Sequence, residues 1–198
     1  MPYSQFTLDE LKSKFSLTIS KVYGKFNNVP GVPPSQFLQE ALEYYLPLAT
    51  AISSKKARSE FIVAPILAEI KKSYDNRISL FSGSEFNVDL ELGLNGCCDF
   101  LLSLSPEQLL IEAPVFVLVE AKNDNLRSGL AQCIAEMVGS QVFNQSKSNE
   151  IAKIYGGITT GTNWQFLELE GQTVFFDLEE YSLNNLPKIL GILTSFVS

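Results

Sequence analysis

An unbroken apolar run from Val115 to Val119 constrains the fold more than any other feature of the sequence. The run is rich in β-branched and aromatic residues, which favour strands. Because it does not alternate with polar residues, we expect both faces of the strand to be covered, as in the interior of an α/β sheet. Glu120 and Lys122 follow almost directly. The sequence therefore predicts a buried strand over residues 115–121 that ends at charged side chains.

Before this strand the apolar residues recur mostly at helical spacing. We predict an N-terminal helical extension over residues 1–54, with a first helix capped by Thr7, a loop over residues 24–34 and a second helix capped by Ser35. The apolar positions that define the first helix are Leu8, Leu11, Phe15, Ile19 and Val22. A third helix is predicted over about residues 56–74, with Pro65 as its kink or its start.

The rest of the chain predicts strands interrupted by one long helix. The expected strands cover residues 78–92, 97–104, 115–121, 153–159, 164–169 and 173–178, and the last three are joined as hairpins. A helix over about residues 125–143, with Asp124 as N-cap, precedes the strand at 153–159, and a final helix covers about residues 186–197. A helix between strands implies a crossover and at least one parallel pair. The predicted fold class is therefore α/β, a mixed β-sheet flanked by helices.

The length of 198 residues fits one buried core. We predict a single domain over residues 1–198, in which residues 1–54 form the extension, residues 55–180 the core and residues 181–198 the C-terminal helix. No apolar run is long enough to cross a bilayer, and the N-terminus carries no pattern typical of a secretory signal. We therefore expect a cytoplasmic protein without a membrane partner.

The sequence contains no histidine, which excludes Ser-His-Asp and Cys-His catalysis and histidine-ligated zinc. Its cysteines, Cys97, Cys98 and Cys133, lack the spacing of a zinc or redox site and are expected to be buried apolar residues. Hydrolytic chemistry must then come from carboxylates, lysine, hydroxyls or a hard metal ion.

The formal net charge of −7 argues against a protein that coats nucleic acid by charge alone. Basic residues outnumber acidic ones over residues 1–77, whereas the acidic excess lies in the remainder. If the chain touches a phosphate backbone, the N-terminal helices are the better candidates. A solvated helical surface explains the same charges equally well.

Charged groups at the ends of two apolar strands point to a site. Glu120 and Lys122 lie two residues apart on one strand, so their side chains share a face. Asp99 interrupts the preceding apolar strand, and it comes to lie opposite them if the two strands form a hairpin. Two carboxylates and an ammonium would then converge, as phosphoryl chemistry with Mg²⁺ or Mn²⁺ requires.

This arrangement resembles the signature of the PD-(D/E)XK nuclease superfamily, whose restriction-endonuclease-like core it would share over about residues 56–170. The resemblance implies that Asp99, Glu120 and the Ala121 carbonyl bind Mg²⁺ or Mn²⁺ and that Lys122 acts on the attacking water. It also implies DNA as the substrate, and a homodimer, since many relatives cut duplexes as dimers. The activity implied is hydrolysis of DNA phosphodiesters.

Two further residues extend the resemblance. Glu60 stands where many members carry a helix acid near the metal, and Gln132 resembles the glutamine of the branch of RecB-like nucleases and type I restriction subunits. Two positions depart from the pattern. Cys98 replaces a proline that the superfamily does not require, and Glu136 stands where that branch often has tyrosine.

Other interpretations remain open at each position. Glu120 and Lys122 can form a structural ion pair, Asp99 can serve the turn after Gly96, and Glu60 can favour a helix dipole. Gln132 can be an ordinary helix residue. Acidic-x-Lys triplets also occur at residues 10–12 and 69–71, where no apolar strand precedes them.

Two rival functions follow. One is a catalytically silent module of the same fold that binds nucleic acid or assembles with other proteins, since fold does not fix function. The other is a metal-dependent phosphohydrolase acting on small nucleotides. Metal affinity at Asp99, Glu120 and Lys122 argues against the silent module. A comparison of polynucleotide with nucleotide substrates distinguishes the nuclease from the small-nucleotide hydrolase.

Overall fold

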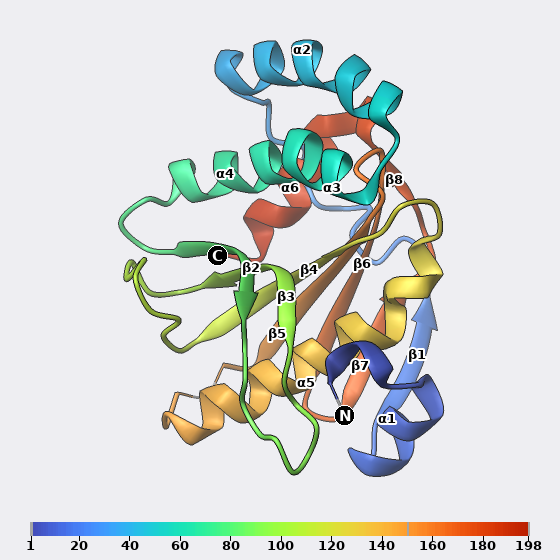
Figure 1. Cartoon of the computed structure of the whole chain (residues 1–198), viewed down its shortest axis with the longest axis vertical. Helices are drawn as coiled ribbons and strands as arrows, with labels where there is room; N and C mark the ends of the chain where they lie inside the picture. Colours follow the sequence, from blue (N-terminus) through green and yellow to red (C-terminus); the bar gives the residue numbers. More distant parts are fainter. Residues whose placement is uncertain (1, 150, 198) are drawn as a thin grey trace.

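The computed structural model describes residues 2–149 and 151–197. The predicted single domain begins at Met1 and ends at Ser198; these two positions and Glu150 lie outside the described residues. The described part is a mixed α/β structure around one eight-stranded sheet (Figure 1). Within it, no helix is long and apolar enough to span a bilayer.

The sheet has the strand order β1-β7-β6-β5-β4-β3-β2, with β8 paired to β6. Its strands are β1 (Thr18–Val22), β2 (Ser79–Glu85), β3 (Cys97–Ser103), β4 (Val115–Ala121), β5 (Lys153–Thr159), β6 (Asn163–Glu170), β7 (Thr173–Asp177) and β8 (Tyr181–Ser182). The β1–β7 and β4–β5 pairs are parallel, and the other pairs are antiparallel. The mixed sheet, the crossover and the hairpins of residues 153–178 are thereby confirmed.

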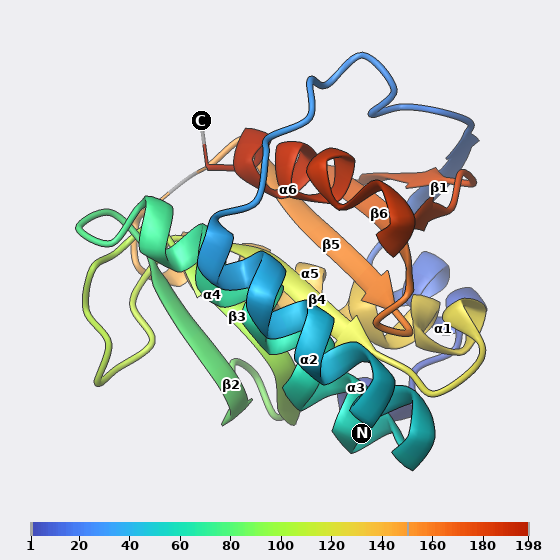
Figure 2. The same cartoon turned by 90° about the horizontal axis from the view of Figure 1, so that it is seen from above.

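Helices cover both faces of this sheet (Figures 1 and 2). The helices are α1 (Leu8–Lys14), α2 (Gln36–Ile52), α3 (Lys55–Arg58), α4 (Ala64–Ser73), α5 (Leu130–Ser146) and α6 (Leu186–Ser195), with a π-helical segment at Ser59–Val63 and short 3-10 turns at Tyr3–Gln5, Leu126–Gly129 and Leu183–Asn185. In Figure 1, α2, α3, α4 and α6 lie above the sheet, and α1 and α5 lie below it. The strand β4 therefore lies between two helical layers, as its unbroken apolar sequence predicts.

The prediction of helix through Val22 is wrong. The first helix ends at Lys14, and Ser16 adopts the left-handed conformation with φ 53°, which breaks the helical path. Residues Thr18–Val22 then form an edge strand that pairs in parallel with β7. Three β-branched residues in this segment favour extended backbone, but the partner strand lies far away in the sequence. The segment over residues 1–54 consequently contributes one strand to the sheet and is not a purely helical extension.

Smaller boundary differences have local causes. Pro65 lacks the amide hydrogen that an α-helix needs, and the chain passes through the π-helical segment Ser59–Val63 before α4 begins at Ala64. The second strand ends at Glu85, short of the predicted residue 92, because the chain then forms a loop closed by a bridge between Asp89 and Leu94. The predicted N-cap Asp124 does not cap. Asn125 instead accepts the amide of Arg127.

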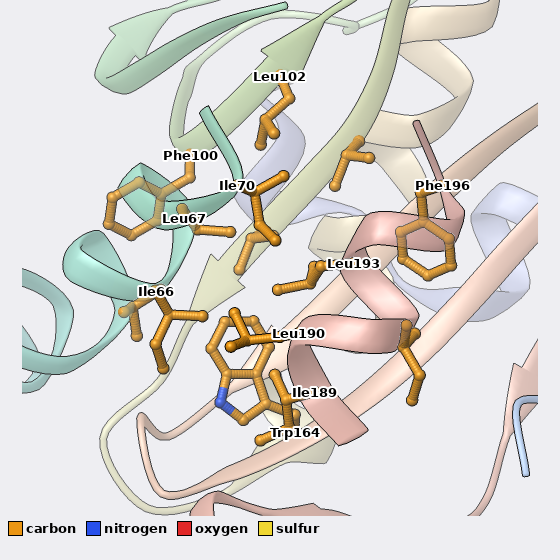
Figure 3. Close-up of a cluster of buried hydrophobic side chains, with 14 of the residues drawn as sticks. Ile66, Leu67, Ile70, Phe100, Leu102, Trp164, Ile189, Leu190, Leu193 and Phe196 are labelled. Carbon is orange, nitrogen blue, oxygen red and sulfur yellow. The ribbon is translucent and has the colours of Figure 1, made fainter. Parts of the chain in front are cut away.

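Two buried apolar clusters, one on each side of the sheet, hold the layers together. One joins side chains of α4 and α6 to the sheet strands, with the indole of Trp164 fully buried among them (Figure 3). The other packs α5 against β4 and β5. Both faces of β4 are thereby covered by apolar side chains, and the charged residues follow directly after Val119.

Candidate active site

The hairpin of β3 and β4 places Asp99 beside the end of β4. The two strands are antiparallel, with Phe100 opposite Val119. The Asp99 carboxylate accepts the backbone amide of Ala121, with Oδ2 at 2.9 Å from the nitrogen. As the sequence predicts, Asp99 contacts the segment that contains Glu120 and Lys122.

Glu120 is the buried centre of the cluster, with a fully inaccessible side chain. Its Oε1 lies 2.7 Å from Nζ of Lys122, which extends from the same strand end. Its Oε2 accepts a hydrogen bond of 2.9 Å from Nε2 of Gln132. Within the described residues, Oε1 accepts no hydrogen bond from an amide or hydroxyl, so the ammonium groups are its polar neighbours.

Gln132 on α5 links the charged groups. Its Oε1 accepts a hydrogen bond of 3.2 Å from Lys122, while its Nε2 donates to Glu120 and, at 3.0 Å, to Oε1 of Glu136. One amide thereby holds an ammonium and two carboxyl groups. Gly129, just before α5, leaves room for the side chains of Lys122 and Glu120. A Cβ at this position would lie 3.0 Å from Cε of Lys122 and 3.3 Å from Cγ of Glu120.

A second lysine, Lys55, also belongs to the site. It is the first residue of α3, which lies on the opposite side of the sheet from α5 (Figure 1). Its Nζ lies 2.8 Å from Oδ2 and 3.1 Å from Oδ1 of Asp99. The same nitrogen is 3.7 Å from Oε1 of Glu120. The cluster therefore holds two ammonium groups, and both lie near Oε1 of Glu120.

The structure does not bring Glu60 into this cluster. Glu60 lies in the π-helical segment, and its exposed carboxylate pairs with Nζ of Lys56 at 3.0 Å. Asp99, Glu120, Lys122 and Gln132 are brought together. Ala121 contributes its amide to Asp99, and a role for its carbonyl stays a prediction.

Burial shapes the electrostatics of the site. Desolvation, reinforced by the charge of Asp99, raises the pKa of Glu120 to about 7, although Lys122 and Lys55 oppose this rise. Burial also raises the pKa of Glu136 well above its ordinary value, with the charge of Glu120 adding to the effect. Burial alone would lower the pKa of Lys55, but its hydrogen bond to Asp99 and the nearby carboxylates raise it. The cluster therefore combines two buried acids, Glu120 and Glu136, with the partly exposed Asp99 and two partly exposed lysines.

The carboxylates of Asp99 and Glu120 are the candidate donors for a hard cation. Within residues 2–149 and 151–197, no group of three or more His, Cys, Asp or Glu side chains is arranged to hold a metal ion. Mg²⁺, however, usually takes only one or two protein carboxylates, together with water and phosphate oxygens. In the structure, Asp99 and Glu120 share one cation, the Lys55 ammonium, at 2.8 Å and 3.7 Å.

Lys55 and the burial of Glu136 were not anticipated from the sequence. No local motif marks Lys55, which lies 44 residues before Asp99. A signal for Glu136 did exist, because it is the one charged residue in the apolar helical stretch from Cys133 to Val138. An acid at such a position indicates a buried carboxyl that needs a polar partner, here Gln132.

Neither a protein-family model nor a curated protein matches the chain. The fold and the cluster define an α/β protein whose mixed sheet carries a carboxylate–lysine cluster at the end of its β3–β4 hairpin.

Proposed function

We propose that the chain is a metal-dependent nuclease of the PD-(D/E)XK type with a restriction-endonuclease-like fold, which hydrolyses DNA phosphodiester bonds. The observation that carries the proposal is the convergence of Asp99, Glu120 and Lys122 at the end of two paired strands. The Glu120 carboxylate is fully buried, and burial of a charge is costly. A simple ion pair could form at the surface without this cost, so the burial of Glu120 favours a functional site.

The order of the elements supports the proposal. The helix α4 precedes an antiparallel meander of β2, β3 and β4, and α5 then leads to β5, which is parallel to β4. This is the helix, three-strand, helix and strand order that the resemblance implies. The choice of DNA as substrate, and of a homodimer as the active form, rests on the resemblance alone.

Each residue of the cluster has a role in this chemistry. Asp99, Glu120 and the Ala121 carbonyl would hold Mg²⁺ or Mn²⁺. Such an ion polarises the phosphoryl oxygen and lowers the pKa of bound water. Lys122 orients the attacking water and offsets charge on the phosphorane-like transition state. Gln132 keeps the Lys122 ammonium beside the Glu120 carboxylate.

The test is cleavage of plasmid and linear DNA with Mg²⁺ or Mn²⁺, comparing the wild type with Lys122→Ala. We expect metal-dependent cleavage that falls at least a hundredfold in the variant, the usual size of a general acid–base contribution. Lys12→Ala is the matched control, because Lys12 ends another acidic-x-Lys triplet and is exposed on α1. Cleavage that survives Lys122→Ala contradicts the assigned role.

No cleavage by any variant, across both metals and both substrates, would favour the catalytically silent module. Hydrolysis of nucleoside triphosphates without cleavage of polynucleotides would favour the small-nucleotide hydrolase. The same preparation serves all three assays.

A further inference from the structure

The position of Lys55 has a consequence for cation binding. Its Nζ lies 2.8 Å and 3.1 Å from the two oxygens of Asp99 and 3.7 Å from Oε1 of Glu120. It is therefore a single positive charge shared by the two carboxylates to which the proposed function assigns a divalent cation. Within the described residues, these carboxylates are the polar partners of the Lys55 ammonium.

An ammonium and a divalent cation cannot share that space. Mg²⁺ binds carboxylate oxygens at about 2.0–2.1 Å, so an ion held by Asp99 and Glu120 would lie close to the present position of the Lys55 nitrogen. Repulsion between like charges at such a separation is strong in a partly buried site. Either the ion stays out or the lysine moves.

We propose that Lys55 is a resident cation of the Asp99–Glu120 pair, and that a divalent metal binds only by displacing it. The inference rests on the proposed function, since it concerns the metal that this function requires. It gives Lys55 a regulatory role, because the position of this side chain sets the metal concentration at which the site fills.

The two lysines of the site differ in how firmly they are held. The Lys122 side chain is 19% exposed and is fixed by Gln132 as well as by Glu120. The Lys55 side chain is 43% exposed, and it extends from the short helix α3. A long, exposed side chain can rotate into water at little cost, so Lys55 is the one that leaves.

Removing the Lys55 charge has two opposite effects under this proposal. Without metal, Asp99 and Glu120 lose a neutralising charge and repel each other, so the protein becomes less stable. With metal, no resident charge has to be displaced, so the ion binds more tightly. A purely structural role for Lys55 predicts the first effect without the second.

The experiment measures Mn²⁺ binding to the wild type, Lys55→Met and Lys56→Met by the loss of the electron paramagnetic resonance signal of free Mn²⁺. Lys56 is the matched control, because it follows Lys55 in the sequence and its ammonium pairs with Glu60 outside the cluster. We expect Lys55→Met to bind Mn²⁺ about three- to tenfold more tightly than the wild type, the size of one partly exposed ion pair. Lys56→Met should bind within about twofold of the wild type.

The outcomes separate the two proposals. Unchanged or weaker binding by Lys55→Met, with normal binding by the wild type, overturns the resident-cation role and leaves the metal site intact. An equal gain in Lys56→Met also overturns it, because the gain then reflects net charge alone. Absence of Mn²⁺ binding in all three proteins overturns the metal site itself, and the inference with it.

A measurement on the wild type alone guards against misfolding of the variant. The rate at which an amine-reactive acetylating reagent modifies Lys55 can be followed by mass spectrometry with and without Mg²⁺. Displacement predicts that Mg²⁺ raises the modification rate of Lys55 and leaves that of Lys56 unchanged. A Lys55 rate that Mg²⁺ leaves unchanged overturns the proposal.

Discussion

The side-chain amide of Asn144 on α5 is hydrogen-bonded to the backbone of Val115 as a neighbouring strand would be. Its Oδ1 accepts the Val115 amide and its Nδ2 donates to the Val115 carbonyl, both at 2.8 Å and both buried. The first residue of β4 is thereby fixed to the helix that also carries Gln132, so the start of the strand and the charged site at its end share one support.

Replacement of Asn144 by leucine should destabilise the protein strongly. The apolar side chain leaves two buried backbone groups of Val115 without partners, at about 1–3 kcal/mol each, so we expect a loss of about 2–6 kcal/mol in the free energy of unfolding. Urea denaturation followed by circular dichroism measures this loss. Gln145→Ala, at the exposed next position, should change the free energy by less than about 0.5 kcal/mol. Equal effects at both positions would contradict the assigned hydrogen bonds.

Gln132→Leu should reduce both the rate of DNA cleavage and the affinity for Mn²⁺. The variant removes the amide that fixes Lys122 and Glu120, and loss of such a supporting contact typically costs about 10–100-fold in activity or metal affinity. DNA cleavage rates and the Mn²⁺ dissociation constant should both be measured. Gln141→Leu on the same helix, where the side chain contacts the Gly171 carbonyl outside the cluster, is the control. A variant that cleaves at the wild-type rate would show that Lys122 needs no such support.

Glu136→Gln should alter how stability depends on pH. Burial raises the pKa of Glu136 well above its ordinary value of 4.5, so the folded protein binds this proton more tightly than the unfolded chain does. The corresponding stability is complete below about pH 4.5 and is lost as the pH rises towards the folded-state pKa. Glutamine stays neutral and still offers Oε1 to Gln132.

The expected result is a free energy of unfolding similar to that of the wild type at about pH 5 and higher than that of the wild type at about pH 8. Urea denaturation at the two pH values measures it. Glu120, whose pKa of about 7 contributes with the same sign, is present in both proteins and cancels to first order in the comparison. A variant that loses stability equally at both pH values would indicate that Glu136 is ionised in the folded protein.

Gly129→Ala should disturb the site through direct contact. The added Cβ would lie 2.9 Å from Cγ2 of Ile158 and 3.0 Å from Cε of Lys122, so at least one of them must move. Overpacking of this kind costs about 1–3 kcal/mol of stability, and the displaced lysine should lower DNA cleavage as well. In Gly171→Ala a Cβ meets no atom within 4 Å, but φ is +57°, so this variant measures backbone strain without crowding and should leave DNA cleavage unchanged. Wild-type cleavage by Gly129→Ala would mean that Lys122 tolerates the shift.

The sequence predicts the centre of this molecule better than its edges. The bounds of β4 and β5 agree with prediction because each strand carries its own signal, a compact β-rich run between turn residues. The edge strand β1 was missed because its helix-like spacing is local, whereas the pairing that makes it a strand depends on β7. Tertiary contacts override local pattern in such cases.

The same distinction applies to the candidate site. Asp99, Glu120 and Lys122 are predictable because they interrupt or end apolar strands. The contact of Gln132 follows from the placement of α5 against β4, and only a family resemblance suggested it beforehand. Lys55 depends on how α3 sits over the opposite face of the sheet, which no local pattern specifies.

The pairing of β1 with β7 also determines when β1 can join the sheet during synthesis of the chain. Gly24, just after β1, donates its amide to Asp177 across 153 residues, so nearly the whole sheet is synthesised before β1 has a partner. Until β7 is synthesised, β1 has no partner strand. Until β1 pairs with it, β7 exposes unpaired backbone groups, to which strands of other molecules can bind. The earlier strand β1 thus covers the edge of the much later strand β7 and itself becomes the outer strand of the sheet.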